Sequence, residues 1–260
     1  MKQFSKQYER FFAFGCSMTN YFWPTWADVI GVEIPEYYNY GKSGAGNLFI
    51  SNSIVEANKK HKFTQNDLIV VMWSSISRED RYKNKNWITP GNIYTQGELD
   101  NKFVYEWADS RFYLIRDLGL IEMASSYLES LPCDHKMLSM SPMIELQISG
   151  TFERPQEEWH TGVMEFYKDT VDKIAEPIVT NVYKGRWPTT PIRGHNGKGQ
   201  TADYHPTPLG HAEYVSNMFP EFEFTEQMRN FAIEMDEKVH LCKTLDDTNK
   251  FWQQRHQSRL

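Results

Sequence analysis

The sequence has little cysteine. Only Cys16, Cys133 and Cys242 occur in 260 residues, and their spacing does not repeat, so neither a disulfide framework nor a zinc site is indicated. No stretch approaches the roughly 18 uninterrupted apolar residues of a membrane span. The first ten residues also lack the apolar run of a secretory signal. We therefore expect a protein of the reducing cytoplasm without a membrane partner.

Basic residues are not in excess either. The formal net charge is −6, from 28 Lys and Arg against 34 Asp and Glu. A broad surface that holds nucleic acid needs clustered Lys and Arg to neutralise phosphates, so we expect no nucleic acid partner. His160 and His195 are isolated and lack the paired spacing of metal ligands. The sequence predicts neither a metal nor a cofactor.

Aromatic residues, in contrast, are abundant at 15% of the chain. Large rings fill a core, and they also line grooves that bind sugars; composition alone fits both interpretations. The proportions of hydrophobic and charged residues, 40% and 24%, are ordinary for one globular domain with insertions. We expect a domain over residues 1–220 with a long polar insertion near 78–110. Residues 221–260 are expected to form a helical tail packed on it.

Short apolar runs alternate with helical patterns along the first part of the chain. Runs at 11–14, 37–40 and 68–73 predict buried strands, and 136–143 predicts a fourth. Amphipathic spacing predicts helices over the ranges 24–30, 47–60, 109–129, 157–173 and 206–218. Strands that alternate with helices predict an α/β fold with a parallel sheet and right-handed crossovers.

Polar turns follow these strands directly. Ser17, Gly44 and Ser75 each come just after a strand, and the carboxyl ends of parallel strands share one edge of a sheet, where active sites lie. A serine there can attack a carbonyl if a base takes its proton and amides hold the oxyanion. His205 is the candidate base, and Asp203 is close enough to orient its imidazole.

Three blocks of the sequence resemble those of the SGNH or GDSL hydrolases. Gly15-Cys16-Ser17 stands where the family has Gly-Asp-Ser. Segment 39–44, Asn-Tyr-Gly-Lys-Ser-Gly, is similar to its Asn…Ser-Gly loop, and segment 205–211, His-Pro-Thr-Pro-Leu-Gly-His, to the block with its histidine. The resemblance covers roughly the first eighty residues plus 203–211. It implies a three-layer α/β sandwich with a mostly parallel, flavodoxin-like sheet of about five strands.

The same resemblance implies the chemistry. Ser17 would form an acyl-enzyme with His205 as general base, and the amides of Ser17 and Gly44 would hold the oxyanion. One block departs from the family pattern, which ends its third strand in Gly-x-Asn and uses that asparagine as a further oxyanion donor. Ile76 stands at this position. Either Ser75, Ser77 or Asn47 donates in its place, or the oxyanion hole is incomplete.

Two further alternatives concern neighbouring residues. Asp203 lies two residues before His205, where the family has three, so either Asp203 or a backbone carbonyl orients the imidazole. Cys16 is an alternative nucleophile beside Ser17, although cysteines of this kind are usually buried hydrophobes. His211 is expected to be a helix-surface or packing residue.

The substrate follows from weaker signals. Arg78 begins a charged cluster, Arg-Glu-Asp-Arg at 78–81, which fits a solvated surface or a contact of Arg78 with an acidic substrate. The polar insertion and the many aromatics favour a carbohydrate O-acetyl ester over a long-chain lipid, so the expected partner is a small-molecule or glycan ester. The alternatives are a catalytically inactive SGNH-like binding or structural domain and an O-acyltransferase.

Overall fold

The chain folds around one parallel sheet. The structure, a computed structural model, describes residues 1–94, 99–143, 158–194 and 202–253. Its central sheet has the strand order β2-β1-β3-β6, and every pairing in it is parallel. The strands are β1 Arg10–Phe14, β2 Glu36–Asn39, β3 Asp67–Trp73 and β6 Asp134–Ser139. The predicted α/β sandwich with a parallel central sheet is confirmed.

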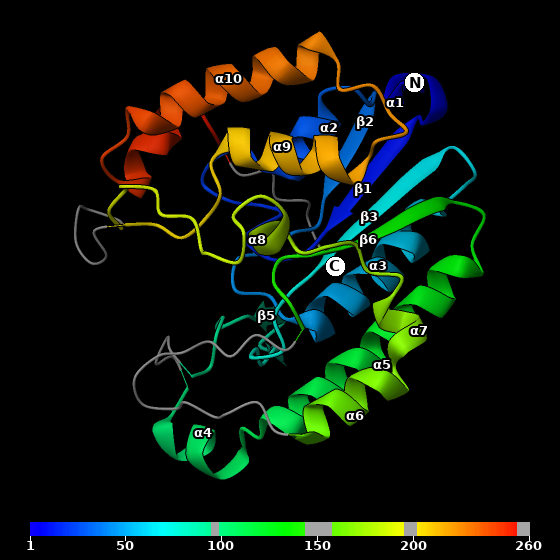
Figure 1. Cartoon of the computed structure of the whole chain (residues 1–260), viewed down its shortest axis with the longest axis vertical. Coiled ribbons are helices and arrows are strands. Elements are labelled where there is room, and N and C mark those ends of the chain that lie inside the picture. The colour runs from blue at the N-terminus through cyan, green and yellow to red at the C-terminus, as the bar shows by residue number, and fades with distance from the viewer. Residues whose placement is uncertain (95–98, 144–157, 195–201, 254–260) are drawn as a thin grey trace.

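Helices cover both faces of this sheet (Figure 1). One face carries α2 Trp26–Gly31, α9 Pro208–Met218 and α10 Glu226–His240. The other carries α3 Asn47–His61, α5 Ser110–Glu129, α6 Glu158–Phe166 and α7 Lys168–Val171. The predicted helices start and end within a few residues of these bounds, except that the single helix predicted over 157–173 is interrupted at Tyr167 and forms α6 and α7. Because parallel strands are covered on both sides, they need side chains that are apolar throughout, and all seven residues of β3 are buried.

Much of the aromatic content lies in this core. Phe11 and Phe12 are fully buried and point to opposite faces of β1, as neighbours on a strand must. Phe11 stacks on Tyr37 with ring centroids 5.2 Å apart, and Phe12 stacks on Tyr38 at 4.8 Å. Stacked aromatic pairs between directly opposite residues thus fix β1 against β2.

The described sheet has four strands rather than about five. Beside β6, where a further strand would pair, Ile174 forms a single parallel bridge with Met137. The amide of Ala175 donates to the Met137 carbonyl at 2.9 Å. Pro177, which has no amide proton, then begins the short helix α8, Ile178–Asn181. The ladder therefore ends after one bridge.

The insertion near 78–110 is more ordered than its polar composition indicates. It holds the hairpin of β4 Arg81–Lys83 and β5 Asn86–Ile88, followed by the helix α4 Asn101–Trp107. The two turn residues, Asn84 and Lys85, both have positive φ, as the tightest hairpin turns require. A small apolar cluster is buried beneath it, formed by Ile93, Val104, Ala108 and Tyr113. The insertion near 78–110 therefore contributes a small buried cluster of its own.

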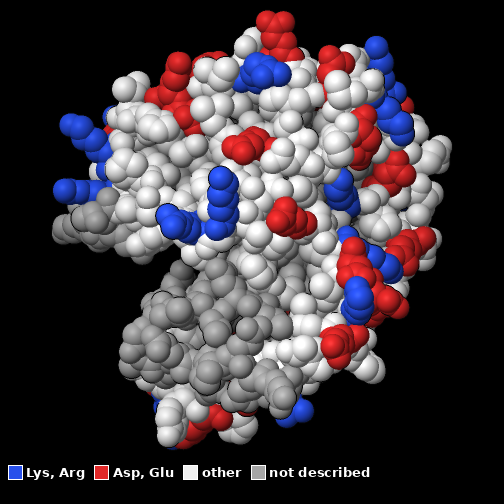
Figure 2. Space-filling model, in the orientation of Figure 1, with Lys and Arg blue, Asp and Glu red and all other residues white. Residues whose placement is uncertain are grey.

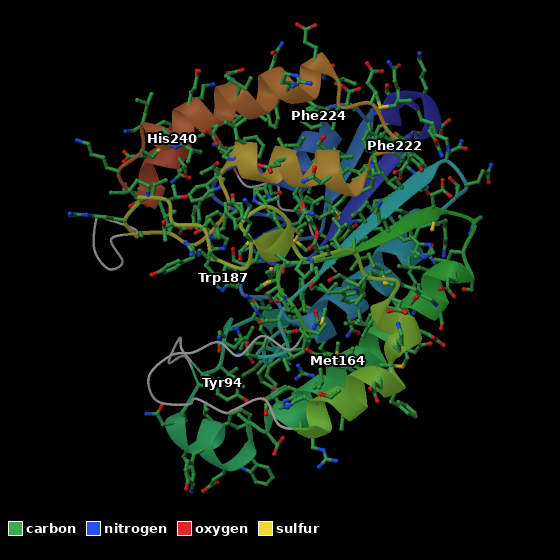
Figure 3. The ribbon with its side chains drawn as sticks, viewed as in Figure 1. Tyr94, Met164, Trp187, Phe222, Phe224 and His240 are labelled. Carbon is green, nitrogen blue, oxygen red and sulfur yellow. The ribbon has the colours of Figure 1, made fainter. Side chains whose placement is uncertain are left out.

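The carboxyl-terminal segment packs on the main body. Phe222, labelled in Figure 3, stacks on Phe4 of the first helix, α1 Phe4–Gln7, with centroids 4.1 Å apart. Helix α10 then runs beside α9 and α2 and buries Met228 and Ala232 in the main core. A 3₁₀ helix, Leu245–Lys250, follows it.

The surface mixes charges of both signs. Figure 2 shows Lys and Arg interspersed with Asp and Glu on the face in view, without a continuous basic area there. Among the described helices, none combines the length and the apolarity that a membrane crossing requires. The absence of a nucleic acid partner stays a prediction.

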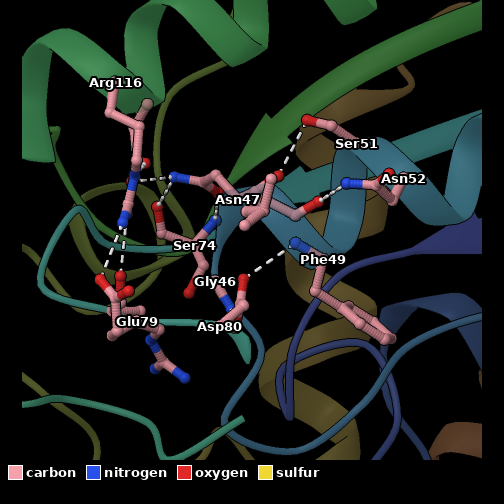
Figure 4. A network of polar contacts seen from close by, with 12 residues as sticks. Gly46, Asn47, Phe49, Ser51, Asn52, Ser74, Glu79, Asp80 and Arg116 are labelled. Carbon is pink, nitrogen blue, oxygen red and sulfur yellow. Dashed lines mark hydrogen bonds and ion pairs between the residues drawn. The ribbon is translucent and has the colours of Figure 1, made fainter. Parts of the chain in front are cut away.

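The amino end of α3 takes its cap from a distant segment. Gly46, at the cap position, has no side chain to offer. Asp80 supplies the acceptors instead, because its Oδ1 accepts from the Gly46 amide and its Oδ2 from the Phe49 amide, both at 2.8 Å (Figure 4). Asp80 and Glu79 are 2% and 7% exposed, so the prediction of a solvated charge cluster at 78–81 is wrong for both.

Removing this cap will destabilise the protein. Asp80→Ala leaves the buried amides of Gly46 and Phe49 without their acceptor, and we expect a loss of about 2 kcal/mol in the free energy of unfolding. Urea denaturation measures this loss. Glu106→Ala, which removes an exposed carboxylate on α4, serves as the matched control and should change stability by less than about 0.5 kcal/mol. Equal stabilities for the two variants would contradict the capping role.

Candidate active site

Ser17, His205 and Asp203 form one continuous hydrogen-bonded chain. His205 Nε2 lies 2.8 Å from Ser17 Oγ, and His205 Nδ1 lies 2.8 Å from Asp203 Oδ1. With the Nδ1 proton facing the carboxylate, Nε2 presents its lone pair to the serine hydroxyl. This is the arrangement in which an imidazole can take a proton from a nucleophile. The three residues are therefore brought together as the sequence predicted.

The turn that carries Ser17 follows β1 without a linker. The carbonyl of Cys16 accepts from the amides of Thr19 and Asn20 at 3.0 and 3.2 Å, which folds the chain back at Ser17. Gly15 permits this fold, since a Cβ there would lie 2.1 Å from Thr19 Oγ1 and 3.0 Å from the Met72 carbonyl. A side chain at this position would open the turn.

The second block is hydrogen-bonded to this turn. Asn39 Nδ2 donates to the Thr19 carbonyl at 2.8 Å, and Asn39 Oδ1 accepts from the Gly41 amide at 2.9 Å. Asn20 Nδ2 returns a hydrogen bond to the Gly41 carbonyl at 3.1 Å. Side-chain amides thus hold the two turns together at the carboxyl ends of β1 and β2.

An Asx turn explains why Asp203 can lie two residues before His205. Asp203 Oδ1 accepts from the backbone amide of His205 at 2.8 Å and also contacts its Nδ1. The backbone of Asp203 is itself fixed by two hydrogen bonds with Thr190, at 2.7 and 2.8 Å. The shorter spacing therefore still brings the carboxylate to the imidazole.

Two aromatic residues that sequence reasoning missed complete this cluster. The ring of Tyr21 stacks on His205 at 3.7 Å, and its hydroxyl donates to Asp203 Oδ2 at 2.5 Å. Trp23 Nε1 donates to the Pro206 carbonyl at 2.8 Å. In the sequence, their closeness to Ser17, four and six residues before them, is the one feature that could have indicated a place at the site.

The carboxylate of Asp203 is held in its charged form. Burial raises its pKa, but the hydrogen bonds from His205 and Tyr21 outweigh burial, so the net shift is downward. The pKa of the Tyr21 phenol is instead raised, by burial and by the adjacent charge of Asp203. Tyr21 is therefore a neutral donor, and Asp203 is an anion that can stabilise a protonated imidazole.

Gly44 lies where the insertion meets the site. Its φ of +75° suits glycine, and a Cβ would lie 2.1 Å from the Thr89 carbonyl. The Gly44 carbonyl accepts from the Gly91 amide at 3.1 Å. The amides of Gly44 and Ser17, by contrast, donate to no acceptor in the described part of the chain. Both donors are thus available to a ligand.

The candidates for the third oxyanion donor differ in availability. Asn47 is excluded, because its amide group donates to the Ser74 carbonyl and to Asp117 at 3.1 and 2.8 Å, while its Oδ1 accepts from Ser74 (Figure 4). Ser75 Oγ and Ser77 Oγ lie 3.0 Å apart, so one of the two hydroxyl protons stays available. The inclusion of Asn47 as a possible oxyanion donor is therefore wrong. Its side chain instead links the start of α3 to the residue that follows β3.

Ile76 has a packing role at the position of the family asparagine. Its partly buried side chain contacts both the main core and the small core of the insertion. An amide at this position would lose those apolar contacts. The departure from the family pattern therefore has a structural cause, since this residue joins the insertion to the sheet.

The thiol of Cys16 is enclosed by the core. Cys16 is fully buried, and its Sγ lies 3.5 Å from Met140 Sδ. Cys16 lies in the main hydrophobic core. A thiol enclosed in this way is not presented to a substrate, which counts against Cys16 as the nucleophile.

No group of three or more potential metal ligands comes together among the described residues. His160 is buried, and His195 lies outside the described residues. His211 is buried on α9, where neither ring nitrogen has a hydrogen-bond partner within the described ranges. Burial, with a smaller contribution from His205, lowers the pKa of His211 to about 3. His211 is therefore a neutral packing residue.

This neutral histidine makes stability depend on pH. The pKa of His211 is lower in the folded than in the unfolded state. The stability that the neutral ring contributes is therefore complete above about pH 6.5 and declines as the pH falls toward 3. We expect the fall in unfolding free energy between pH 7 and pH 5 to be about 2 kcal/mol smaller in His211→Leu. Urea denaturation at the two pH values measures it. The control is His240→Leu, on the exposed end of α10, which should not reduce this loss of unfolding free energy. If the loss in His211→Leu equalled that of the native protein, His211 would not be the buried neutral group.

No protein-family model matches the sequence, and no curated protein matches it. Solved structures similar to the chain include an acetylxylan esterase from Geobacillus stearothermophilus, with a TM-score of 0.42 and 13% identity over 84% of this chain and 96% of that one. A GDSL-like lipase from Bacteroides thetaiotaomicron has a TM-score of 0.41 and 13% identity, over 83% and 88%. A member of the lipolytic G-D-S-L family from Veillonella parvula gives 0.39 and 14%, over 80% and 96%. These are likenesses of fold.

Proposed function

We propose that this chain is a serine ester hydrolase of the SGNH type, with Ser17 as nucleophile, His205 as general base and Asp203 as the group that positions His205. The observation that carries the proposal is the hydrogen-bonded chain from Ser17 Oγ through both ring nitrogens of His205 to Asp203. A serine hydroxyl is a weak nucleophile until a base accepts its proton, and this geometry supports that transfer.

The reaction follows from these contacts. His205 Nε2 takes the Ser17 proton as Oγ bonds to the ester carbonyl carbon, and the carbonyl oxygen becomes an oxyanion. The imidazolium, stabilised by Asp203, then protonates the departing alcohol and leaves an acyl group on Ser17. A water molecule, deprotonated by His205, attacks the acyl-enzyme and releases the acid. Ser17 regains its proton at the end of the cycle.

Backbone donors stabilise the oxyanion in this proposal. The unengaged amides of Ser17 and Gly44 are the two donors, and the hydroxyl pair of Ser75 and Ser77 is the candidate third. Each correctly placed donor typically contributes a factor of about 100 or more to the rate. A site without the family asparagine can therefore be active while turning over more slowly.

The residues around Ser17 and His205 support a proposal for the acyl group and the alcohol of the ester. The hairpin over Gly44 is short, and the side chains of β4 and β5 are largely exposed, so they do not form an extended apolar lid for a long acyl chain. Tyr204, next to His205, is 51% exposed and offers a ring to a sugar face. These features support O-acetyl groups on carbohydrate as the substrate class.

Steady-state hydrolysis of 4-nitrophenyl acetate tests the proposal. Ser17→Ala and His205→Ala should each lower kcat by about 1,000-fold or more, because the nucleophile or its base is removed. Ser5→Ala, on the exposed side of α1, is the matched control and should keep native activity. Activity that persists in Ser17→Ala but vanishes in Cys16→Ala would contradict the choice of nucleophile. A folded native protein without activity would favour a binding domain.

The role of Asp203 has its own test. Asp203→Asn keeps the size of the side chain, but its amide favours the wrong imidazole tautomer and no longer stabilises the imidazolium. We expect kcat to fall by about 1,000- to 10,000-fold with little change in folding. Asp172→Asn, at an exposed pair with Lys168, should have native kcat. If Asp203→Asn retained most of the activity, a backbone carbonyl would be the group that orients His205.

A further inference from the structure

Two partly buried arginines among the described residues are paired with carboxylates. Arg10 forms an ion pair with Asp67 at 2.6 Å, and Arg116 pairs with Asp117 at 2.6 Å and with Glu79 at 3.2 Å. Such pairing is expected, because a charge removed from water is costly unless a counter-charge compensates it. Arg78 is buried more completely than either, and the described part of the chain supplies no ion pair for it.

Arg78 has guanidinium N–H groups that no protein acceptor uses in the described part of the chain. The residue is 9% exposed, and its Nε has no hydrogen-bond acceptor within the described ranges. The polar contact of its guanidinium is a weak one, from Nη2 to Met140 Sδ at 3.8 Å. The charge of Arg78 acts on the nearby carboxylate of Asp80, but both oxygens of Asp80 already accept hydrogen bonds from amides at the start of α3. Glu79 is paired with Arg116 and Arg81.

A second unused donor lies opposite Arg78. Asn92 is 5% exposed, and its Oδ1 accepts from the Tyr94 amide at 2.9 Å, which fixes which way the amide group points. Its Nδ2 is buried and has no acceptor among the described residues. Arg78 and Asn92 form an antiparallel bridge, so their side chains lie on the same face of the paired segments.

This pair of donors borders the Gly44 loop. Gly91, the neighbour of Asn92, donates to the Gly44 carbonyl at 3.1 Å. Arg78 lies against the same loop, since a Cβ on Gly46 would come 2.8 Å from Arg78 Cβ. The two donors therefore lie beside the loop whose Gly44 amide is one of the proposed oxyanion donors.

We propose that Arg78 and Asn92 together bind a carboxylate of the substrate, so that the ester belongs to an acidic sugar or a similar acid. The inference rests on the proposed esterase function and specifies its substrate class. A guanidinium and an adjacent amide offer parallel N–H donors that match the two oxygens of a carboxylate. A full negative charge on the bound substrate also compensates the buried positive charge, which a neutral sugar cannot do.

Selectivity between two matched esters tests this proposal. The substrates are O-acetylated glucuronic acid and equally acetylated glucose, which differ by the carboxylate. We expect the native protein to prefer the acid by at least about tenfold in kcat/KM, and Arg78→Met to lower this ratio at least about tenfold. Arg81→Met, which removes an exposed arginine three residues on, should leave the ratio unchanged. Equal losses on both esters in Arg78→Met would overturn the proposal, since they would indicate a role at the oxyanion.

Asn92→Asp provides a second variant that keeps Arg78 in place. It has nearly the same shape, but its carboxylate repels that of the substrate, so the ratio should fall at least about tenfold. An unchanged ratio in this variant would contradict the pairing of the two donors.

Binding of free glucuronate, measured by calorimetry, separates this proposal from the esterase function because it needs no turnover. Glucuronate that binds the native protein but not Arg78→Met supports the carboxylate site even if no ester is hydrolysed. Ester hydrolysis without glucuronate binding and without a preference for the acid would overturn the carboxylate site and leave the esterase function standing.

Discussion

The contact between Ser17 Oγ and His205 Nε2, 2.8 Å long, joins residues 188 positions apart in the chain. Every other feature of the site depends on whether this contact is maintained. On one side, the tight turn after β1 holds the hydroxyl. On the other, the Asx turn of Asp203, which is bonded to Thr190, holds the imidazole. The parallel sheet brings the strand ends to one edge, and the loop before α9 brings His205 there.

Buried polar groups do much of the positioning. Asn39 and Asn47 each satisfy backbone groups on neighbouring turns, and Asp80 satisfies the amides at the start of α3. Such groups are costly to bury without partners, so each of them selects one arrangement of the loops. Arg78 and Asn92 are among the described side chains that retain an unused buried donor, and the proposed carboxylate would satisfy both of them.

Apolar runs predicted β1 and β3 well, because strands buried on both faces need continuous hydrophobic sequence. The blocks around Ser17 and His205 also predicted which residues meet, since their spacing reflects local turns. Asn47, Tyr21 and Asn92 could not be placed in this way. Their roles depend on contacts between segments distant in sequence, such as the bridge of Asn92 with Arg78. The charged run at 78–81 was misjudged for the same reason, because its partners come from α3 and α5.

The central claim is that His205 activates Ser17 as a nucleophile. A fluorophosphonate traps such a serine covalently, and mass spectrometry of the intact protein followed by peptide mapping identifies the modified residue. We expect one adduct per chain, on Ser17, formed in the native protein and lost in His205→Ala. A folded native protein that stays unmodified, or an adduct on a residue other than Ser17, would contradict it.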